Sequence, residues 1–157
     1  MIKLLRVDHR LLHGQVAFSW CHTLGANAIL VVSDSVAKDE IRMKTMRLAK
    51  PSGVKLVIKS VDDSIAAITS GVTDKYDLLI VAGCVADAER IARACGIGSL
   101  NLGGTEKKED TTKSLGIAVH LNDDERKLVR GLIRDGIEVE VRQVAKDKKL
   151  VISESDL

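Results

Sequence analysis

The segment RVDHRLLHGQV, Arg6 to Val16, contains the residues of this chain that are best suited to do chemistry. His13 stands where a predicted strand ends and a predicted helix begins, and Gly14 follows it. A helix N-terminus offers unpaired N–H groups and about half a positive charge, so it attracts anions and disfavours a protonated imidazole. A neutral ring there can attack a phosphoryl group. Arg10 adds a planar fork that matches phosphate oxygens. The segment therefore predicts a histidine positioned to react with phosphate.

Three neighbouring residues each allow two interpretations. Asp8 either caps a turn or orients Arg10 or His13. Gly14 either leaves room for the backbone to approach a phosphoryl group or is an ordinary glycine at a helix start. Gln15, in the first helical turn, either touches phosphate or faces solvent. Residue type and spacing leave all three choices open.

Short apolar runs alternate with helical patterns along the chain, which is typical of an α/β domain. The predicted strands are Ile2–Val7, Ala28–Val32, Val54–Lys59, Tyr76–Ala82, Ile97–Leu102, Ile117–Leu121 and Ile137–Val144, followed by either a last strand or a tail at Leu150–Ser153. The predicted helices are Gly14–Leu24, Val36–Lys50, Val61–Ser70, Val85–Ala94 and a helix that Asn122 or Asp123 caps and that runs to Arg134. We expect the polar segment Gly103–Lys113 to be an exposed loop.

These patterns predict one domain, residues 1–157, with a doubly wound, mostly parallel sheet of about seven strands and helices on both faces. Ligands of such sheets bind outside the carboxyl ends of the strands. The loop that holds His13, the residue Asp34 and the segment Asn101–Gly104 each follow a predicted strand and could meet at this edge. The simpler interpretation makes Asp34 a cap for the helix from Val36 onward and makes Asn101–Gly104 a tight turn. Strand order, which decides between these interpretations, is not readable from the sequence.

Composition excludes several classes of function. The net charge of +2 and the three aromatic residues Phe18, Trp20 and Tyr76 give no basic field and no stacking platform, so we expect no nucleic-acid partner. No apolar run approaches the roughly 20 residues that span a bilayer. The start MIKLLRVDHR lacks the apolar segment of a signal peptide, so we expect a cytoplasmic protein.

Metal and nucleotide sites are not indicated either. The spacing of His9, His22 and His120 gives no metal-binding set, and we expect surface or structural roles for these three histidines. Cys21, Cys84 and Cys95 form no CxxC pair and are expected to be free buried thiols. Neither G-x-G-x-x-G nor a P-loop pattern occurs. We therefore expect no metal and no cofactor. Trp20 lies on the apolar side of the first predicted helix and is expected to pack in the core.

The segment Arg6–Val16 resembles the active-site loop of the EIIB component of the bacterial phosphoenolpyruvate-dependent sugar phosphotransferase system (PTS), mannose/fructose/sorbose family, where R-[IV]-D-x-R-L-[IL]-H-G-Q-V is typical. His9 departs from that pattern, because many relatives have an acidic residue there. Weaker similarities are found at Trp20, Val31–Glu40, Ala49–Lys55 and Asn101–Gly104.

The resemblance implies that His13 is the phosphorylated residue and that Arg10 stabilises the phosphate, with Arg6, Asp8, Gly14 and Gln15 in support. It further implies that an EIIA protein or domain donates the phosphoryl group and that a sugar receives it through the membrane subunits EIIC and EIID. The domain would then be a phosphotransferase that associates peripherally with the membrane through those subunits. A homo-oligomer stays open, and the sugar is not indicated.

Two other classes of protein compete with this one. A phosphomutase or phosphatase with a histidine nucleophile typically has Arg directly before His-Gly, and this chain has Leu12 there. A receiver-type signalling domain needs an Asp at the end of its third strand, and the segment Lys55–Lys59 ends without one.

Overall fold

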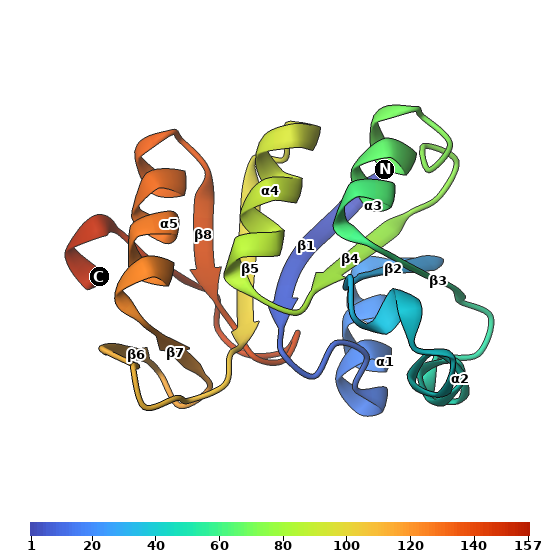
Figure 1. Ribbon diagram of the computed structural model, residues 1–157, viewed down its shortest axis with the longest axis horizontal. Coiled ribbons are helices and arrows are strands. Elements are labelled where there is room, and N and C mark those ends of the chain that lie inside the picture. Colours follow the sequence, from blue (N-terminus) through green and yellow to red (C-terminus); the bar gives the residue numbers. More distant parts are fainter.

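The computed structural model describes residues 1–157 and contains a central sheet between two layers of helices (Figure 1). The strands are β1 (Ile2–Asp8), β2 (Ala28–Val32), β3 (Lys55–Lys59), β4 (Leu78–Ala82), β5 (Ser99–Gly104), β6 (Lys113–Leu115), β7 (Val119–Leu121), β8 (Glu138–Val141) and β9 (Leu150–Val151). The helices are α1 (Gly14–Leu24), α2 (Glu40–Ala49), α3 (Val61–Thr69), α4 (Val85–Cys95) and α5 (Asp123–Arg134), with short 3-10 helices at Val36–Lys38 and Glu154–Asp156.

The seven-stranded sheet has the order β3-β2-β4-β1-β5-β8-β9. All neighbours run parallel except β8 and β9, which are antiparallel. The predicted doubly wound, mostly parallel sheet with helices on both faces is therefore confirmed. β1 lies in the middle, between β4 and β5. This position brings the loop after β1 next to the end of β5 and separates it from β2 by one strand.

The two faces of the sheet have separate apolar cores. On one face, residues such as Leu5 and Leu30 pack against α3, α4 and α5. On the other face, Leu4 and Ile29 pack with Trp20 of α1 and Met46 of α2. Side chains alternate along a strand, so Arg6 and Asp8 point to the same face as Leu4, towards α1.

Most helix boundaries follow from local signals. Gly25 ends α1 in the left-handed conformation that glycine tolerates, with φ of 65°. Asn122 and Glu125 form a capping box at the start of α5, so Asn122 is the N-cap of the helix that was predicted to begin there. No helix has the combined length and apolar character that a membrane crossing needs.

Several predicted elements were wrong in extent. The helix expected at Val36–Lys50 is divided, because Asp39 takes an extended conformation and caps α2 by accepting from Arg42 N–H. The strand expected at Ile117–Leu121 is shortened to β7, which pairs antiparallel with β6, and Ile117 is exposed in the turn between them. The strands expected at Tyr76–Ala82, Ile97–Leu102 and Ile137–Val144 are all displaced or shortened, as the bounds above show.

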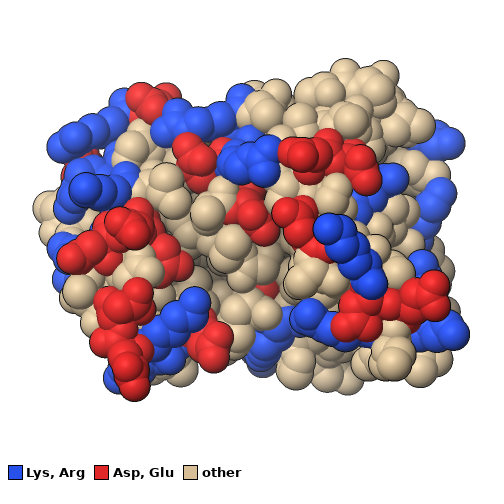
Figure 2. Space-filling view, in the orientation of Figure 1, with Lys and Arg blue, Asp and Glu red and all other residues tan.

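The segment expected to be an exposed loop, Gly103–Lys113, begins inside the sheet. Gly103 and Gly104 are the last residues of β5, and both are buried together with Thr105. Asn101–Gly104 is thus a strand end and not the tight turn that was the simpler interpretation. Over the face of α3, α4 and α5, basic and acidic side chains are intermingled, with no extended field of one sign (Figure 2).

Candidate functional site

The loop between β1 and α1 is organised by Asp8, the last residue of β1. Its carboxylate Oδ1 accepts from the backbone N–H of Arg10 at 3.0 Å, which is the pattern of an Asx turn. Its carbonyl oxygen accepts from Leu11 N–H at 2.9 Å, which closes a four-residue turn. Both interpretations weighed for Asp8 therefore describe its contacts, because it caps this turn and also binds the Arg10 side chain.

Leu11 occupies an unusual backbone conformation in this loop. Its φ of 60° is the only positive φ of a non-glycine residue in the chain, and such a conformation is costly for an ordinary L-residue. The side chain is buried, and it lies so close to Gly83 that a Cβ there would be 3.2 Å from Leu11 Cδ2. Packing of Leu11 at the end of β4 thus holds the strained turn in place.

His13 is the N-cap residue of α1 and is exposed to solvent. Its backbone is extended, with φ of −117° and ψ of 110°, and its side chain makes no capping hydrogen bond. Backbone hydrogen bonding of α1 begins at Ala17, whose N–H donates to the His13 carbonyl oxygen at 2.9 Å. The N–H groups of residues 14–16 point ahead of the helix without a protein acceptor, as expected for a first turn. An exposed imidazole thus lies at the positive end of a helix dipole.

The side chain of Arg10 lies across the carboxylate of Asp8. Arg10 Nε donates to Asp8 Oδ1 at 3.1 Å, and its terminal NH2 group donates to Oδ2 at 3.0 Å, so the pair is bidentate. The Arg10 side chain remains 31% exposed, whereas that of Asp8 is 1% exposed. The carboxylate therefore fixes one edge of the guanidinium group, and part of the group stays accessible to a ligand.

Arg6 binds the same carboxylate from inside the protein. Its NH2 group donates to Asp8 Oδ2 at 3.1 Å, and both partners are buried. Burial lowers the pKa of the Arg6 guanidinium, an effect that the nearby Asp8 charge partly offsets. Burial would raise the pKa of Asp8, but hydrogen bonds from Arg10 and the charges of Arg6 and Arg10 outweigh it, and the pKa lies below its usual range. The site therefore contains an ionised carboxylate between two guanidinium groups.

The terminal nitrogens of Arg6 also donate to residues distant in sequence. Its NH1 group donates to Asn101 Oδ1 at 2.7 Å and to the Arg142 carbonyl at 3.1 Å, and its NH2 group donates to the Gln143 carbonyl at 2.8 Å. The guanidinium groups of Arg6 and Arg142 both lie over the indole ring of Trp20, at 5.2 and 4.7 Å from its centroid. These contacts join β1, β5, α1 and the segment after β8.

A cavity of about 290 Å³ adjoins the loop on the side of β5 and the β6–β7 hairpin. His9 and Arg10 line it together with Lys107 and His120, and His13 does not. His9 is exposed, and its backbone N–H donates to the Gly104 carbonyl at 3.0 Å. His9 therefore lies beside Arg10 on the β5 side of the loop.

The other residues singled out from the sequence divide into those near the loop and those elsewhere. Gly14 has open space where a side chain would be, because the nearest atom to a Cβ is the Ala49 carbonyl oxygen at 4.0 Å. Gln15 is exposed. Asp34 accepts from Val61 N–H at 2.9 Å, so it stabilises the start of α3; Ser33 is the residue that accepts from Val36 N–H. Asp34 is therefore not the cap expected at Val36.

The cysteines and remaining histidines are dispersed. Cys21 is buried, Cys95 is half-buried and Cys84 is exposed, so the expectation of three buried thiols was wrong for Cys84. His22 is exposed, and His120 is bonded within its hairpin to Ser114 and Ile117. No group of three or more His, Cys, Asp or Glu side chains is arranged to hold a metal ion.

Of the inner part of the site, the sequence indicated Arg6 and the segment Asn101–Gly104 but not the contact between them. Trp20 was expected only to pack in the core, and Arg142 and Gln143 were not considered. The strained Leu11 was also missed. The sequence did contain a signal for Asn101, because it is a lone amide in an otherwise apolar strand. A polar side chain that is buried there needs a hydrogen-bond partner. No sequence signal pointed to Arg142, since its contact depends on strand order.

Comparison with known proteins shows that this chain is similar to one protein family. The model of the family described as "PTS system sorbose subfamily IIB component" matches residues 2–155. A probable phosphotransferase enzyme IIB component of Streptococcus pyogenes is 36% identical over 117 residues, 72% of each chain. The PTS mannose-specific EIIAB component of Escherichia coli is 32% identical over 96% of this chain, which spans only 46% of that longer protein.

A solved structure agrees with these matches. The IIB domain of the sorbose permease from Klebsiella pneumoniae superposes with a TM-score of 0.87 at 29% identity, covering 96% of this chain and 92% of that one. The family match covers nearly the whole chain, and the fold described above is shared with this relative. The chain therefore belongs to the sorbose subfamily of PTS IIB components, phosphoryl-transfer subunits of sugar phosphotransferase systems.

Proposed function

We propose that His13 accepts a phosphoryl group from the phosphohistidine of an EIIA protein and passes it to a sugar taken up through EIIC and EIID. The observation that supports this most is the exposed, unbonded imidazole of His13 at the start of α1, ahead of N–H groups with no protein acceptor. That arrangement suits a nucleophile whose product carries negative charge.

Arg10 supplies the second part of the proposed site. A ring nitrogen of His13 forms a bond to phosphorus while the nitrogen–phosphorus bond of the donor breaks, and the resemblance to the family implies Nδ1 as that nitrogen. The transferred group spreads its charge over three oxygens, so positioning and positive charge are the main requirements. Arg10, held at one edge by Asp8, offers its accessible N–H groups to those oxygens.

The partners follow from the family. In Escherichia coli the matching relative is named as an EIIAB component, which supports an EIIA protein as the donor for this chain. The hydroxyl oxygen of the acceptor sugar forms a bond to phosphorus, the bond from phosphorus to His13 breaks, and the hydroxyl proton is released to solvent. The sugar is not proposed, because relatives named for mannose, sorbose and N-acetylgalactosamine all match.

A relay experiment tests this function. The purified protein is incubated with labelled phosphoenolpyruvate and the upstream carrier proteins, and membranes with the sugar-specific subunits are then added with sugar. We expect an acid-labile, base-stable label, as for a nitrogen–phosphorus bond, that discharges only when both membranes and sugar are present. A label that forms but does not discharge to any sugar would contradict the proposed transfer to sugar.

A further inference from the structure

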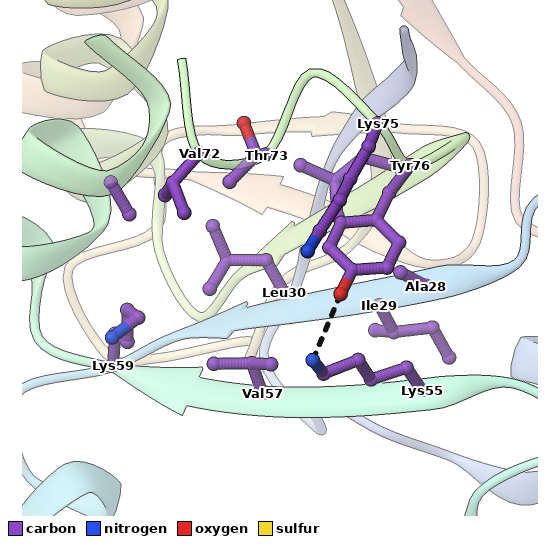
Figure 3. A pocket seen from close by; sticks show the side chains of 12 residues that line it. Ala28, Ile29, Leu30, Lys55, Val57, Lys59, Val72, Thr73, Lys75 and Tyr76 are labelled. Carbon is purple, nitrogen blue, oxygen red and sulfur yellow. Dashed lines mark hydrogen bonds between the residues drawn. The ribbon is translucent and has the colours of Figure 1, made fainter. Parts of the chain in front are cut away.

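A second cavity, of about 300 Å³, lies beside the outer strand β3 (Figure 3). It shares no lining residue with the His13 loop or with the cavity next to it. Lys55, Ala28 and Leu78 begin β3, β2 and β4, so this end of the cavity is at the amino edge of the parallel strands. The His13 loop follows the carboxyl end of β1. The residues to which the proposed function assigns a role are not among those that line this cavity.

The floor of the cavity is apolar. The face of β3 that points to the α3 side of the sheet is left partly uncovered, and Val57 at its centre is only half-buried. Leu30 and Ala67 continue the apolar surface from β2 and α3, and Val72 closes it from the loop before β4. Figure 3 shows Leu30 and Val57 in the middle of this surface. A ligand with an apolar body could remove this surface from water.

The charged groups around this floor are all of one sign. Lys55, Lys59 and Lys75 line the cavity, and no aspartate or glutamate does. None of the three lysines forms an ion pair, although Lys3 and Lys149 do elsewhere. Figure 3 shows Lys59 at one end of the cavity and Lys55 and Lys75 at the other. The cavity thus offers three ammonium groups without a counter-ion.

Tyr76 holds two of these ammonium groups near each other. Its hydroxyl oxygen accepts from Lys55 Nζ at 2.9 Å. The ammonium groups of Lys55 and Lys75 lie 5.1 and 5.2 Å from the centroid of its ring. These contacts reduce the freedom of two flexible side chains before any ligand binds, which lowers the entropic cost of binding an anion.

We propose that this cavity binds a small organic anion, with a phosphate or carboxylate head group between Lys55 and Lys75 and an apolar body against Leu30 and Val57. The volume lies at the lower end of the range of small-molecule sites, so the ligand is no larger than a substituted ring. Lys59 binds a second polar substituent at the far end. The head group and the apolar body are both required, since either alone uses only half of the cavity.

Tyr76 provides a direct probe, because it is the only tyrosine of the chain, so in protein labelled with carbon-13 at tyrosine alone its ring signals are identified by the label. Phenyl phosphate and benzoate are titrated as the two candidate anions, with inorganic phosphate as the head group alone and benzyl alcohol as the body alone. We expect a saturable shift of the Tyr76 ring with phenyl phosphate, benzoate or both. The tighter of the two identifies the head group. Inorganic phosphate and benzyl alcohol should bind at least about tenfold more weakly.

The matched variants are Lys55→Gln/Lys75→Gln in the cavity and Lys146→Gln, an exposed lysine without an ion pair, outside it. The double variant should weaken binding by about tenfold or more, as expected when charged hydrogen-bond donors are lost. Lys146→Gln should bind as the wild type does. Phosphoryl acceptance by His13 should be unchanged in both variants, which separates this test from that of the proposed function.

Three results would overturn the proposal. One is the absence of a saturable Tyr76 shift with both organic anions. Another is equal affinity in the double variant and in Lys146→Gln, which would place binding elsewhere. The third is binding of inorganic phosphate as tight as that of the tighter organic anion, which would show that the apolar floor is not used.

Discussion

The guanidinium carbon of Arg6 lies where a side chain at residue 103 would be, since a Cβ on Gly103 would be 2.0 Å from Arg6 Cζ. The backbone of β5 therefore approaches the buried Arg6 more closely than any residue with a Cβ permits. Arg6 in turn binds Asp8, and Asp8 binds Arg10. Gly103 is thus linked, through Arg6 and Asp8, to Arg10, the arginine that is proposed to bind phosphate.

Gly103→Ala should displace the Arg6 side chain and weaken its buried pair with Asp8. Breaking such a pair costs about 3–5 kcal/mol, so we expect a loss of about 3 kcal/mol in the free energy of unfolding in urea. Gly104→Ala is the matched control, because the nearest atoms to a Cβ there are at an ordinary 3.7 Å. Similar losses in the two variants would contradict the importance of the close approach at Gly103.

Arg10→Ala should slow phosphoryl transfer by about 10²–10³-fold, as when one preorganised donor is removed from a transition-state site. The variant also loses the two side-chain hydrogen bonds from Arg10 to the buried Asp8. We therefore expect its free energy of unfolding to be lower by about 1–2 kcal/mol. Arg10→Lys should recover only part of the rate, since an ammonium group lacks the bidentate fork. Rates are measured with phosphorylated EIIA as donor. An unchanged rate in Arg10→Ala would show that other groups bind the phosphate.

The ionised Asp8 should make stability depend on pH in the acid range. Its native pKa is below the unfolded value near 4, so its contribution is fully present above that value and is lost as the pH falls through the native pKa. Asp8→Asn lacks this contribution at every pH. We therefore expect its deficit in urea unfolding to be large at pH 7 and to shrink towards pH 3. The exposed Glu109→Gln serves as control, and a deficit that stays constant with pH would contradict this assignment.

The three cysteines should differ in reactivity towards an aromatic disulfide reagent at pH 8. Burial raises the pKa of Cys21 to about 11, so only about one Cys21 thiol in a thousand is ionised at that pH. Cys84 is the exposed cysteine and should react first. Partial desolvation of its thiol raises its pKa as well, but the thiol remains accessible to the reagent. Cys84→Ser should remove the fast phase. If Cys21→Ser removes it instead, the burial of Cys21 is wrong.

The sequence was sufficient for the elements that local patterns determine. The apolar run of β2 was predicted with both ends correct, and α1 was predicted to start after His13 and to end before Gly25. These boundaries depend on a strand-to-helix junction and a glycine, both visible in the sequence. The break at Asp39 was missed because the apolar pattern continues through it, and only the cap of α2 reveals it.

The sequence could predict the outer part of the candidate site, whereas for the inner part it indicated Arg6 and the segment Asn101–Gly104 without their contacts. Asp8, Arg10 and His13 lie within six residues, so their proximity follows from one loop. The contacts of Arg6 with Asn101 and with the Arg142 carbonyl join residues 95 and 136 positions apart. They exist because β5 lies next to β1 and β8 lies next to β5, and strand order is set by tertiary packing. Strand order also explains why Asp34, which follows β2, is not part of the candidate site: β4 lies between β1 and β2.

The identity of the phosphorylated residue tests the central claim most directly. The wild type, His13→Ala and His9→Ala are each incubated with phosphoenolpyruvate and the upstream carrier proteins, and the label is measured and mapped by mass spectrometry at alkaline pH. His13 is exposed and unbonded, so His13→Ala should change stability by less than about 0.5 kcal/mol. The account predicts one phosphoryl group on His13 in the wild type and in His9→Ala, and none in His13→Ala. A label on folded His13→Ala, or a label mapped to His9, would contradict it.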